Sequence, residues 1–109
     1  MVLKDNLIIT KESVLKNLKR ITNQIYKLLP NREENIDWEI PLKTIIIELS
    51  GMNIIFEEIG EEYMFSLLCK LQGLFQLKEE EDFFDYRRTI FDCLNIISTL
   101  KEEIEKCQD

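Results

Sequence analysis

Apolar residues recur along most of the chain at steps of three and four, the spacing that keeps side chains on one face of an α-helix. The first such stripe consists of Val14, Leu18, Ile21, Ile25 and Leu28. We expect a helix over residues 11–29, with Thr10 as its N-cap, because a threonine hydroxyl can accept a bond from a free backbone N–H. Pro30 is expected to end it, since the residue before a proline is disfavoured in the α conformation.

A second helix is predicted over residues 41–59. It begins at Pro41, a preferred first helical residue, and Gly60 is expected to cap its C-terminus. Its apolar seam is Leu42, Ile45, Leu49, Met52, Phe56 and Ile59, and beside this seam lie Ile46, Ile47, Ile54 and Ile55. Gly51 falls in mid-helix, where it costs about 1 kcal/mol relative to alanine, and a close helix crossing is one reason to have it there.

Two further helices are predicted over residues 61–77 and 79–106. The third carries Met64, Leu67, Leu71 and Leu74, and the fourth repeats Phe83, Ile90, Ile97 and Ile104 every seven residues. One long loop, which contains the only tryptophan (Trp38), and two short junctions favour antiparallel neighbours. The pattern therefore predicts an all-α, antiparallel four-helix bundle with a long C-terminal helix, as a single domain over residues 1–109. We expect Trp38 to close one end of its core.

Composition excludes several kinds of chemistry. The 109 residues contain no histidine, which rules out a histidine base, a Ser-His-Asp triad and histidine metal ligands. The three glycines are far apart, so no phosphate-binding glycine loop is present. Cys69, Cys93 and Cys107 form no CxxC pair and are typical of reduced thiols. We expect a cytoplasmic protein without a membrane span, a catalytic site, a metal or a cofactor.

The net charge of −7 is unevenly distributed along the chain. Residues 1–32 carry a net +5 and residues 33–109 a net −12. The polar side of the first helix carries Lys16, Lys19, Arg20 and Lys27. This basic strip is either a solvated face or a site for nucleic-acid phosphates, and the acidic remainder of the chain disfavours the second interpretation.

An acidic cluster precedes the fourth helix, and two aromatic residues lie beside that helix's main stripe. The cluster consists of Glu79, Glu80, Glu81, Asp82 and Asp85, and the aromatic residues are Phe84 and Phe91. Acids suit a helix N-terminus, and they also suit a surface that docks on a basic protein partner. The surplus apolar residues indicate either a wide core or an association surface, with a homodimer as the expected assembly.

The mixed run Tyr86, Arg87 and Arg88 is the best candidate for binding a small ligand through a phosphate or carboxylate. The alternative is that the two arginines pair with neighbouring acids such as Asp85 or Asp92.

Two stretches of the chain, residues 25–42 and 83–91, resemble small uncharacterised helical proteins encoded by bacteriophages and mobile elements of low-GC bacteria. The absence of alanine and the 16 isoleucines fit an AT-rich genome. The resemblance implies an accessory protein that binds and blocks a host or defence protein. The first hypothesis is therefore a non-enzymatic inhibitor with an acidic and apolar helical surface. A nucleotide-signal-binding protein is the alternative, and nucleic-acid binding through the first helix is third.

Overall fold

The computed structural model of the chain describes residues 11–52 and 60–106, and within these residues the secondary structure is helical, without strands. The α-helices are α1 (Lys11–Glu33), α2 (Glu39–Gly51), α3 (Glu61–Gly73) and α4 (Phe83–Glu105). Two 3₁₀ turns, η3 (Leu74–Gln76) and η4 (Glu80–Asp82), lie between α3 and α4. The predicted all-α class and the long C-terminal helix are confirmed.

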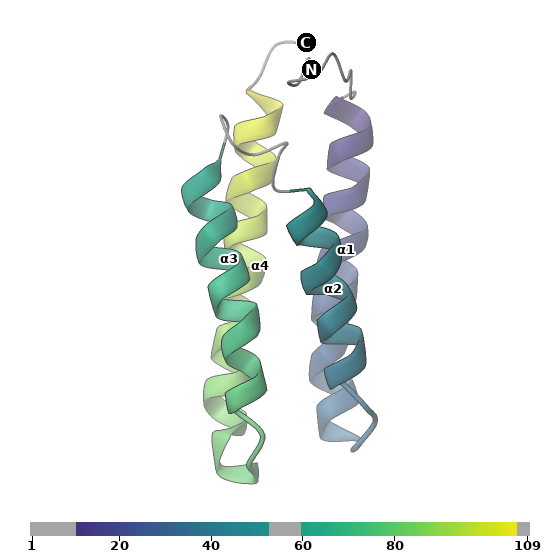
Figure 1. The fold of residues 1–109 in the computed structure, drawn as a ribbon, viewed down its shortest axis with the longest axis vertical. Coiled ribbons are helices and arrows are strands. Elements are labelled where there is room, and N and C mark those ends of the chain that lie inside the picture. Colours follow the sequence, from purple (N-terminus) through teal and green to yellow (C-terminus); the bar gives the residue numbers. More distant parts are fainter. Residues whose placement is uncertain (1–10, 53–59, 107–109) are drawn as a thin grey trace.

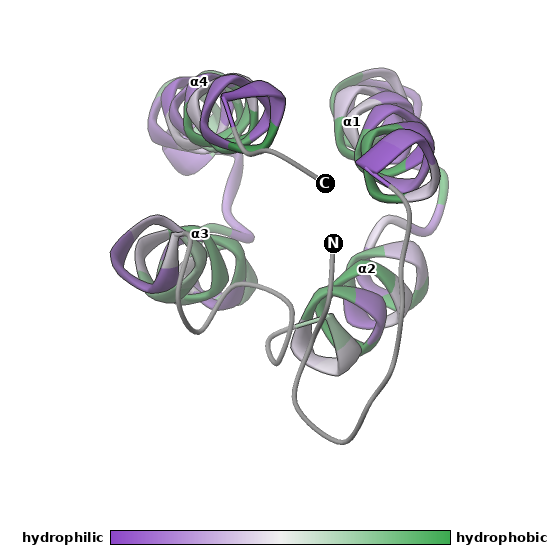
Figure 2. Ribbon diagram, turned by 90° about the horizontal axis from the view of Figure 1, so that it is seen from above, coloured by the Kyte–Doolittle hydropathy of each residue, from purple (hydrophilic) through white to green (hydrophobic). Residues whose placement is uncertain are grey.

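Successive helices run in opposite directions and pack side by side as a bundle (Figure 1). Viewed along the bundle, they follow one another around a ring, so that α4 returns to lie beside α1 (Figure 2). At one end of the α1–α4 pair the Lys11 ammonium donates to the backbone oxygen of Glu105 at 3.2 Å. The ring order places the α1–α4 side of the bundle opposite the α2–α3 side.

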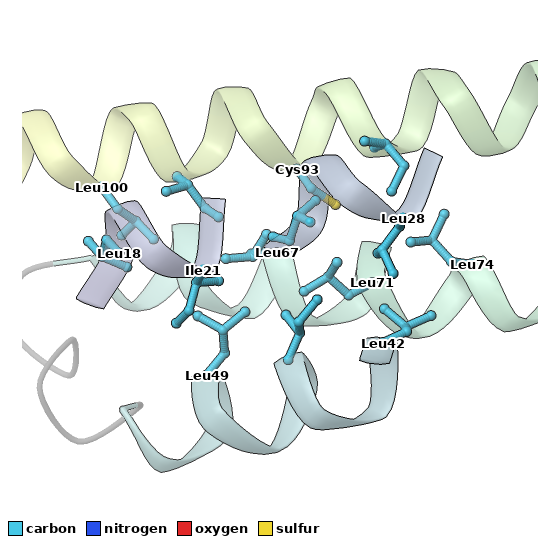
Figure 3. Close-up of a cluster of buried hydrophobic side chains, with 14 of the residues drawn as sticks. Leu18, Ile21, Leu28, Leu42, Leu49, Leu67, Leu71, Leu74, Cys93 and Leu100 are labelled. Atoms are coloured by element: carbon cyan, nitrogen blue, oxygen red, sulfur yellow. The ribbon is translucent and has the colours of Figure 1, made fainter. Parts of the chain in front are cut away.

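The core is built from the apolar positions that the three–four spacing predicts (Figure 3). No polar or charged residue of the described part of the chain is buried apart from the tyrosine and cysteine counted with the core. Burying a leucine or isoleucine side chain contributes about 1.5–3 kcal/mol, so these buried apolar residues stabilise the bundle. The buried residues include Leu18, Ile21, Ile25, Leu28, Leu42, Leu49, Leu67, Leu71, Ile90, Cys93, Ile97 and Leu100.

The expectation that Pro30 ends the first helix is wrong, because α1 continues to Glu33. Pro30 and Tyr26, four residues earlier, are both exposed, so water can reach the carbonyl oxygen that the missing proline N–H leaves without a helical partner. The helix ends instead in a Schellman motif. Asn35 takes a left-handed φ of 58°, and the Ile36 N–H donates to the Asn31 oxygen at 2.8 Å.

The predicted bounds of the second helix, 41–59, are also corrected. Helix α2 begins two residues earlier, at Glu39, because the Asp37 carboxylate accepts the N–H of Glu39 at 3.0 Å. The helix ends at Gly51, which is therefore not a mid-helix residue. Among the described residues, no atom lies within 4 Å of the position a Gly51 Cβ would occupy, so a close crossing of these helices does not explain this glycine.

Residues 53–59 of the predicted second helix lie outside the described residues, and Ile54 and Ile55 are among them. Gly60, expected as the C-cap of a helix that would run through those residues, is the residue before α3, and its backbone oxygen accepts the N–H of Met64 at 2.9 Å. The third helix gives way at Gly73 to the turn η3 rather than continuing as an α-helix to residue 77.

The fourth helix begins as a 3₁₀ turn rather than as an α-helix at residue 79. In η4 the Asp82 carboxylate accepts the backbone N–H of Glu79 at 3.2 Å, and α4 follows from Phe83. Acidic residues at this start satisfy free N–H groups and suit the positive end of the helix dipole. Trp38 closes the core at the same end of the bundle, with its ring 5.0 Å from that of Tyr86 and 6.4 Å from that of Phe75.

Candidate protein-binding surface

The structure does not bring Tyr86, Arg87 and Arg88 together as a ligand site. Successive residues of an α-helix point about 100° apart, and these three occupy different sides of α4. The Tyr86 side chain is fully buried, whereas both arginines are exposed. Burial raises the pKa of Tyr86 above its ordinary value, and the nearby positive charge of Arg32 opposes this only in part. Arg88 donates to the Asp85 carboxylate at 3.2 Å, as the alternative interpretation expects.

The cation that contacts Tyr86 is Arg32, which the sequence placed in a loop. Because α1 continues through Pro30, Arg32 follows Ile25 and Leu28 on the inward stripe. Its guanidinium lies 4.6 Å from the Tyr86 ring centroid and donates to the backbone oxygens of Leu77 and Glu79 at 2.8 and 2.7 Å. Arg32 therefore links the end of α1 to the segment between η3 and η4 through two hydrogen bonds.

A cleft of about 860 Å³ opens beside Arg32 at this end of the bundle. It combines Arg32 and Lys78 with four carboxylates, those of Glu33, Asp37, Glu39 and Glu80. Lys78 is paired with Glu39 at 3.5 Å, and Arg32 is engaged with backbone oxygens. The surplus of negative charge disfavours a phosphate or carboxylate ligand in this cleft.

Exposed aromatic and cationic side chains gather on the side of the bundle formed by α1 and α4. On α4, Phe84, Arg87 and Phe91 follow one another at steps of three and four, and Phe84 and Phe91 are 69% and 37% exposed. The Phe91 ring meets the 55% exposed Tyr26 of α1 edge-to-face, with centroids 6.5 Å apart. The Arg87 guanidinium lies 5.2 Å from the Phe91 centroid. We call Tyr26, Phe84, Arg87 and Phe91 the aromatic face.

The acidic cluster lies next to this face, at the start of α4, and its members have different roles. Asp82 caps η4 and Asp85 pairs with Arg88, so both have local structural partners. Glu79 accepts Arg32 through its backbone oxygen. The carboxylates of Glu80 and Glu81 are exposed and form no ion pair with any residue that the structure describes. They precede Phe84 by four and three residues, and we call these two carboxylates the acidic rim.

The basic residues of α1 are exposed but not all are free. Arg20 forms an ion pair with Glu48 of α2 at 2.9 Å. Lys16, Lys19 and Lys27 form no ion pair within residues 11–52 and 60–106. The predicted phosphate-binding strip therefore has one unpaired cation fewer, which weakens its electrostatic attraction for a polyanion.

A second exposed apolar surface lies on the side formed by α2 and α3. Ile47, predicted as surplus, is 71% exposed, and Phe65 of α3, which sequence reasoning missed, is 70% exposed. Ile46 is half-buried against the core, as the wide-core interpretation expects, whereas Ile47 remains exposed. Phe65 could have been found from its position, since it lies outside the stripe of Met64, Leu67 and Leu71.

The remaining candidate chemistry is limited. Cys93 is buried, and this burial raises its pKa to about 12, whereas Cys69 is exposed. Within the described residues, no group of three or more Cys, Asp or Glu side chains is placed to hold a metal ion. None of the helices in the described ranges is long and apolar enough to cross a membrane.

Comparisons of the chain with protein-family models, with curated proteins and with solved structures gave no match.

Proposed function

We propose that this chain is a non-enzymatic binding protein that blocks a partner protein through the aromatic face and its acidic rim. The observation that carries the proposal is the exposure of Tyr26, Phe84 and Phe91 around Arg87 on one side of a rigid helix pair. Aromatic residues and arginine are the residue types that most often dominate the binding energy of protein interfaces.

The chemistry of this face favours a macromolecular partner over a small ligand. Its side chains lie on the outside of two packed helices, and the cleft at the end of the bundle carries excess negative charge. The neighbouring Glu80 and Glu81 suit a partner that has basic residues beside an apolar patch. Blocking then results from occupancy, because a helix pair seated on a partner's surface excludes that partner's other ligands. The implied setting is that of an accessory protein of a phage or mobile element.

Affinity capture from lysates of low-GC bacteria tests this proposal. The wild-type chain, the double variant Phe84→Ala/Phe91→Ala and the control Ile40→Ala would be immobilised and the bound proteins quantified. We expect one or a few proteins to be held by the wild type and the control but lost by the double variant. Circular dichroism checks that all three are folded. If no protein is enriched at micromolar concentration, or if the double variant captures the same proteins equally well, the proposal is wrong.

Once a partner is captured, its activity should fall in proportion to the amount of added chain. Inhibition that is complete at one equivalent supports blocking by occupancy. Inhibition that continues to grow with incubation time at substoichiometric amounts would point instead to catalysis.

A further inference from the structure

The α2–α3 side of the bundle lies opposite the α1–α4 side (Figure 2), and each of its two helices carries a line of exposed residues. On α3 and the adjoining turn η3 its residues step 4-4-3-4, and on α2 they step 3-4-3, so each set lies along one side of its helix. All of them are exposed. We call this the α2–α3 face, which consists of Glu61, Phe65, Cys69, Gln72 and Gln76 with Ile40, Lys43, Ile47 and Ser50.

The α2–α3 face contains both a projecting side chain and a groove. Phe65 is 70% exposed near the start of α3. Further along, a groove of about 450 Å³ runs between the helices, lined by Lys43, Ile46, Ile47, Gln72, Phe75 and Gln76. At 1.5 Å per residue, Phe65 lies about 6 Å to one side of Cys69, and Phe75 lies about 9 Å to the other. Cys69 therefore lies near the midpoint between them.

The charges of the α2–α3 face are separated in the same way. Glu61 and Glu62 are exposed in the first turn of α3, at the Phe65 end, while Lys43 lines the groove at the other end. None of the three forms an ion pair within the part of the chain that the structure describes. The face thus has an acidic end with a projecting ring and a basic end with an apolar groove.

We infer that the chain forms a two-fold dimer through the α2–α3 face, with the axis near Cys69. A two-fold contact joins the same patch of both copies, so residue i of one meets residue j of the other and the reverse. Rotation about Cys69 reverses α3 and brings Phe65 of each copy to the groove of the other. The same rotation brings Lys43 to the partner subunit's Glu61 and the partner subunit's Glu62.

Charge complementarity and position both favour a second copy of this chain as the occupant. A chain of net charge −7 repels itself through most of its surface, but this face pairs its own acidic end with its own basic end. The aromatic faces of both copies stay on the outside, because they lie on the opposite side of the bundle. This inference does not depend on the proposed function, and it makes the assembly bivalent for its partner.

Light scattering on the full chain tests the dimer and its face. The wild type should show twice the mass of the 13.1 kDa chain. Phe65→Glu should weaken the dimer about tenfold or more, because it removes the ring that fills the partner's groove. Phe84→Glu is the matched control, with the same exposure on the opposite side, and should leave the dimer intact. A monomeric wild type at about 100 µM, where even a Kd of ~10 µM gives mostly dimer, overturns the inference.

Charge reversal tests the orientation of the two copies. Lys43→Glu alone should weaken the dimer, since it sets acid against acid. Adding Glu61→Lys and Glu62→Lys to the same chain should restore it, because the two-fold contact then pairs the reversed charges. If the triple variant is weaker than Lys43→Glu alone, the proposed orientation is wrong.

Cysteine cross-linking tests the axis. In a Cys107→Ser background the exposed thiol of the described residues is Cys69, since Cys93 is buried. A short bismaleimide should give a covalent dimer in this background and none when Cys69→Ser is added. A dimer by mass that shows no Cys69 cross-link, or that persists unchanged in Phe65→Glu, places the contact elsewhere and overturns the inference.

Discussion

Replacing Tyr86 with phenylalanine is expected to stabilise the fold, because the change removes a buried hydroxyl and keeps the ring. The Tyr86 ring contacts the Arg32 guanidinium, which lies 4.6 Å from the ring centroid, and the Trp38 ring, whose centroid lies 5.0 Å from that of Tyr86. The hydroxyl oxygen is buried and has no hydrogen-bond partner among the described residues. An unsatisfied buried polar group costs about 1–3 kcal/mol.

We therefore expect Tyr86→Phe to raise the free energy of unfolding by about 1–2 kcal/mol. For a domain near this size, each kcal/mol raises Tm by roughly 4–8 °C. Urea and thermal unfolding followed by circular dichroism measure it. Tyr86→Ala is the control for the ring contacts and should cost about 3–5 kcal/mol. A loss of stability in Tyr86→Phe would refute the reasoning, since it would show that the hydroxyl is satisfied in the folded state.

The stabilities of the wild type and of Tyr86→Phe should also differ in their dependence on pH. Burial raises the pKa of Tyr86 in the folded state, while in the unfolded chain it ionises near pH 10. The folded state therefore keeps the neutral form, and the stability that this side chain contributes is full below about pH 10 and falls as pH rises, by up to about 1.4 kcal/mol per unit. Tyr86→Phe lacks this loss, so its advantage over the wild type should widen above pH 10.

Three further changes test other parts of the structure. Arg32→Ala should lower the free energy of unfolding by about 2–4 kcal/mol, because it removes two hydrogen bonds to carbonyl oxygens and the contact with Tyr86; a loss below about 0.5 kcal/mol in urea would contradict the linking role. Burial raises the pKa of Cys93 from 9.0 to about 12, so between these pH values the wild type should lose more stability than Cys93→Ala, which keeps only the loss from Tyr86; urea titrations at several pH values would show the difference. Asn35→Val should cost about 1–2 kcal/mol and Asn35→Gly almost nothing, since φ is 58° there; equal melting temperatures would argue against a left-handed cap.

Apolar spacing predicted most of the core residues, although Met52 and Phe83 of the predicted seams are only half-buried. The stripe Val14, Leu18, Ile21, Ile25 and Leu28 is buried as expected, because the period of 3.6 is a property of the helix itself. Local signals at helix ends were less reliable. Pro30 does not end α1, which continues to Glu33, and Gly60 is the residue before α3.

Burial of the candidate site residues could not be predicted from their types. Tyr86, Arg87 and Arg88 are adjacent in sequence, but helical geometry sends one inward and two outward. Phe84 and Phe91 were recognised as lying beside the stripe, yet their contact with Tyr26 depends on α4 returning next to α1. That neighbour relation is tertiary, and no periodicity within a single helix encodes it.

Site-specific photo-cross-linking tests most directly the central claim that the aromatic face is the partner-binding surface. The photoreactive residue benzoylphenylalanine would replace Phe84 in one sample and Phe65 in another, which keeps an exposed aromatic ring at each position. With the captured partner present, we predict a covalent complex with that partner from position 84 and no covalent complex with it from position 65. A partner that cross-links from position 65 and not from position 84 would contradict the account.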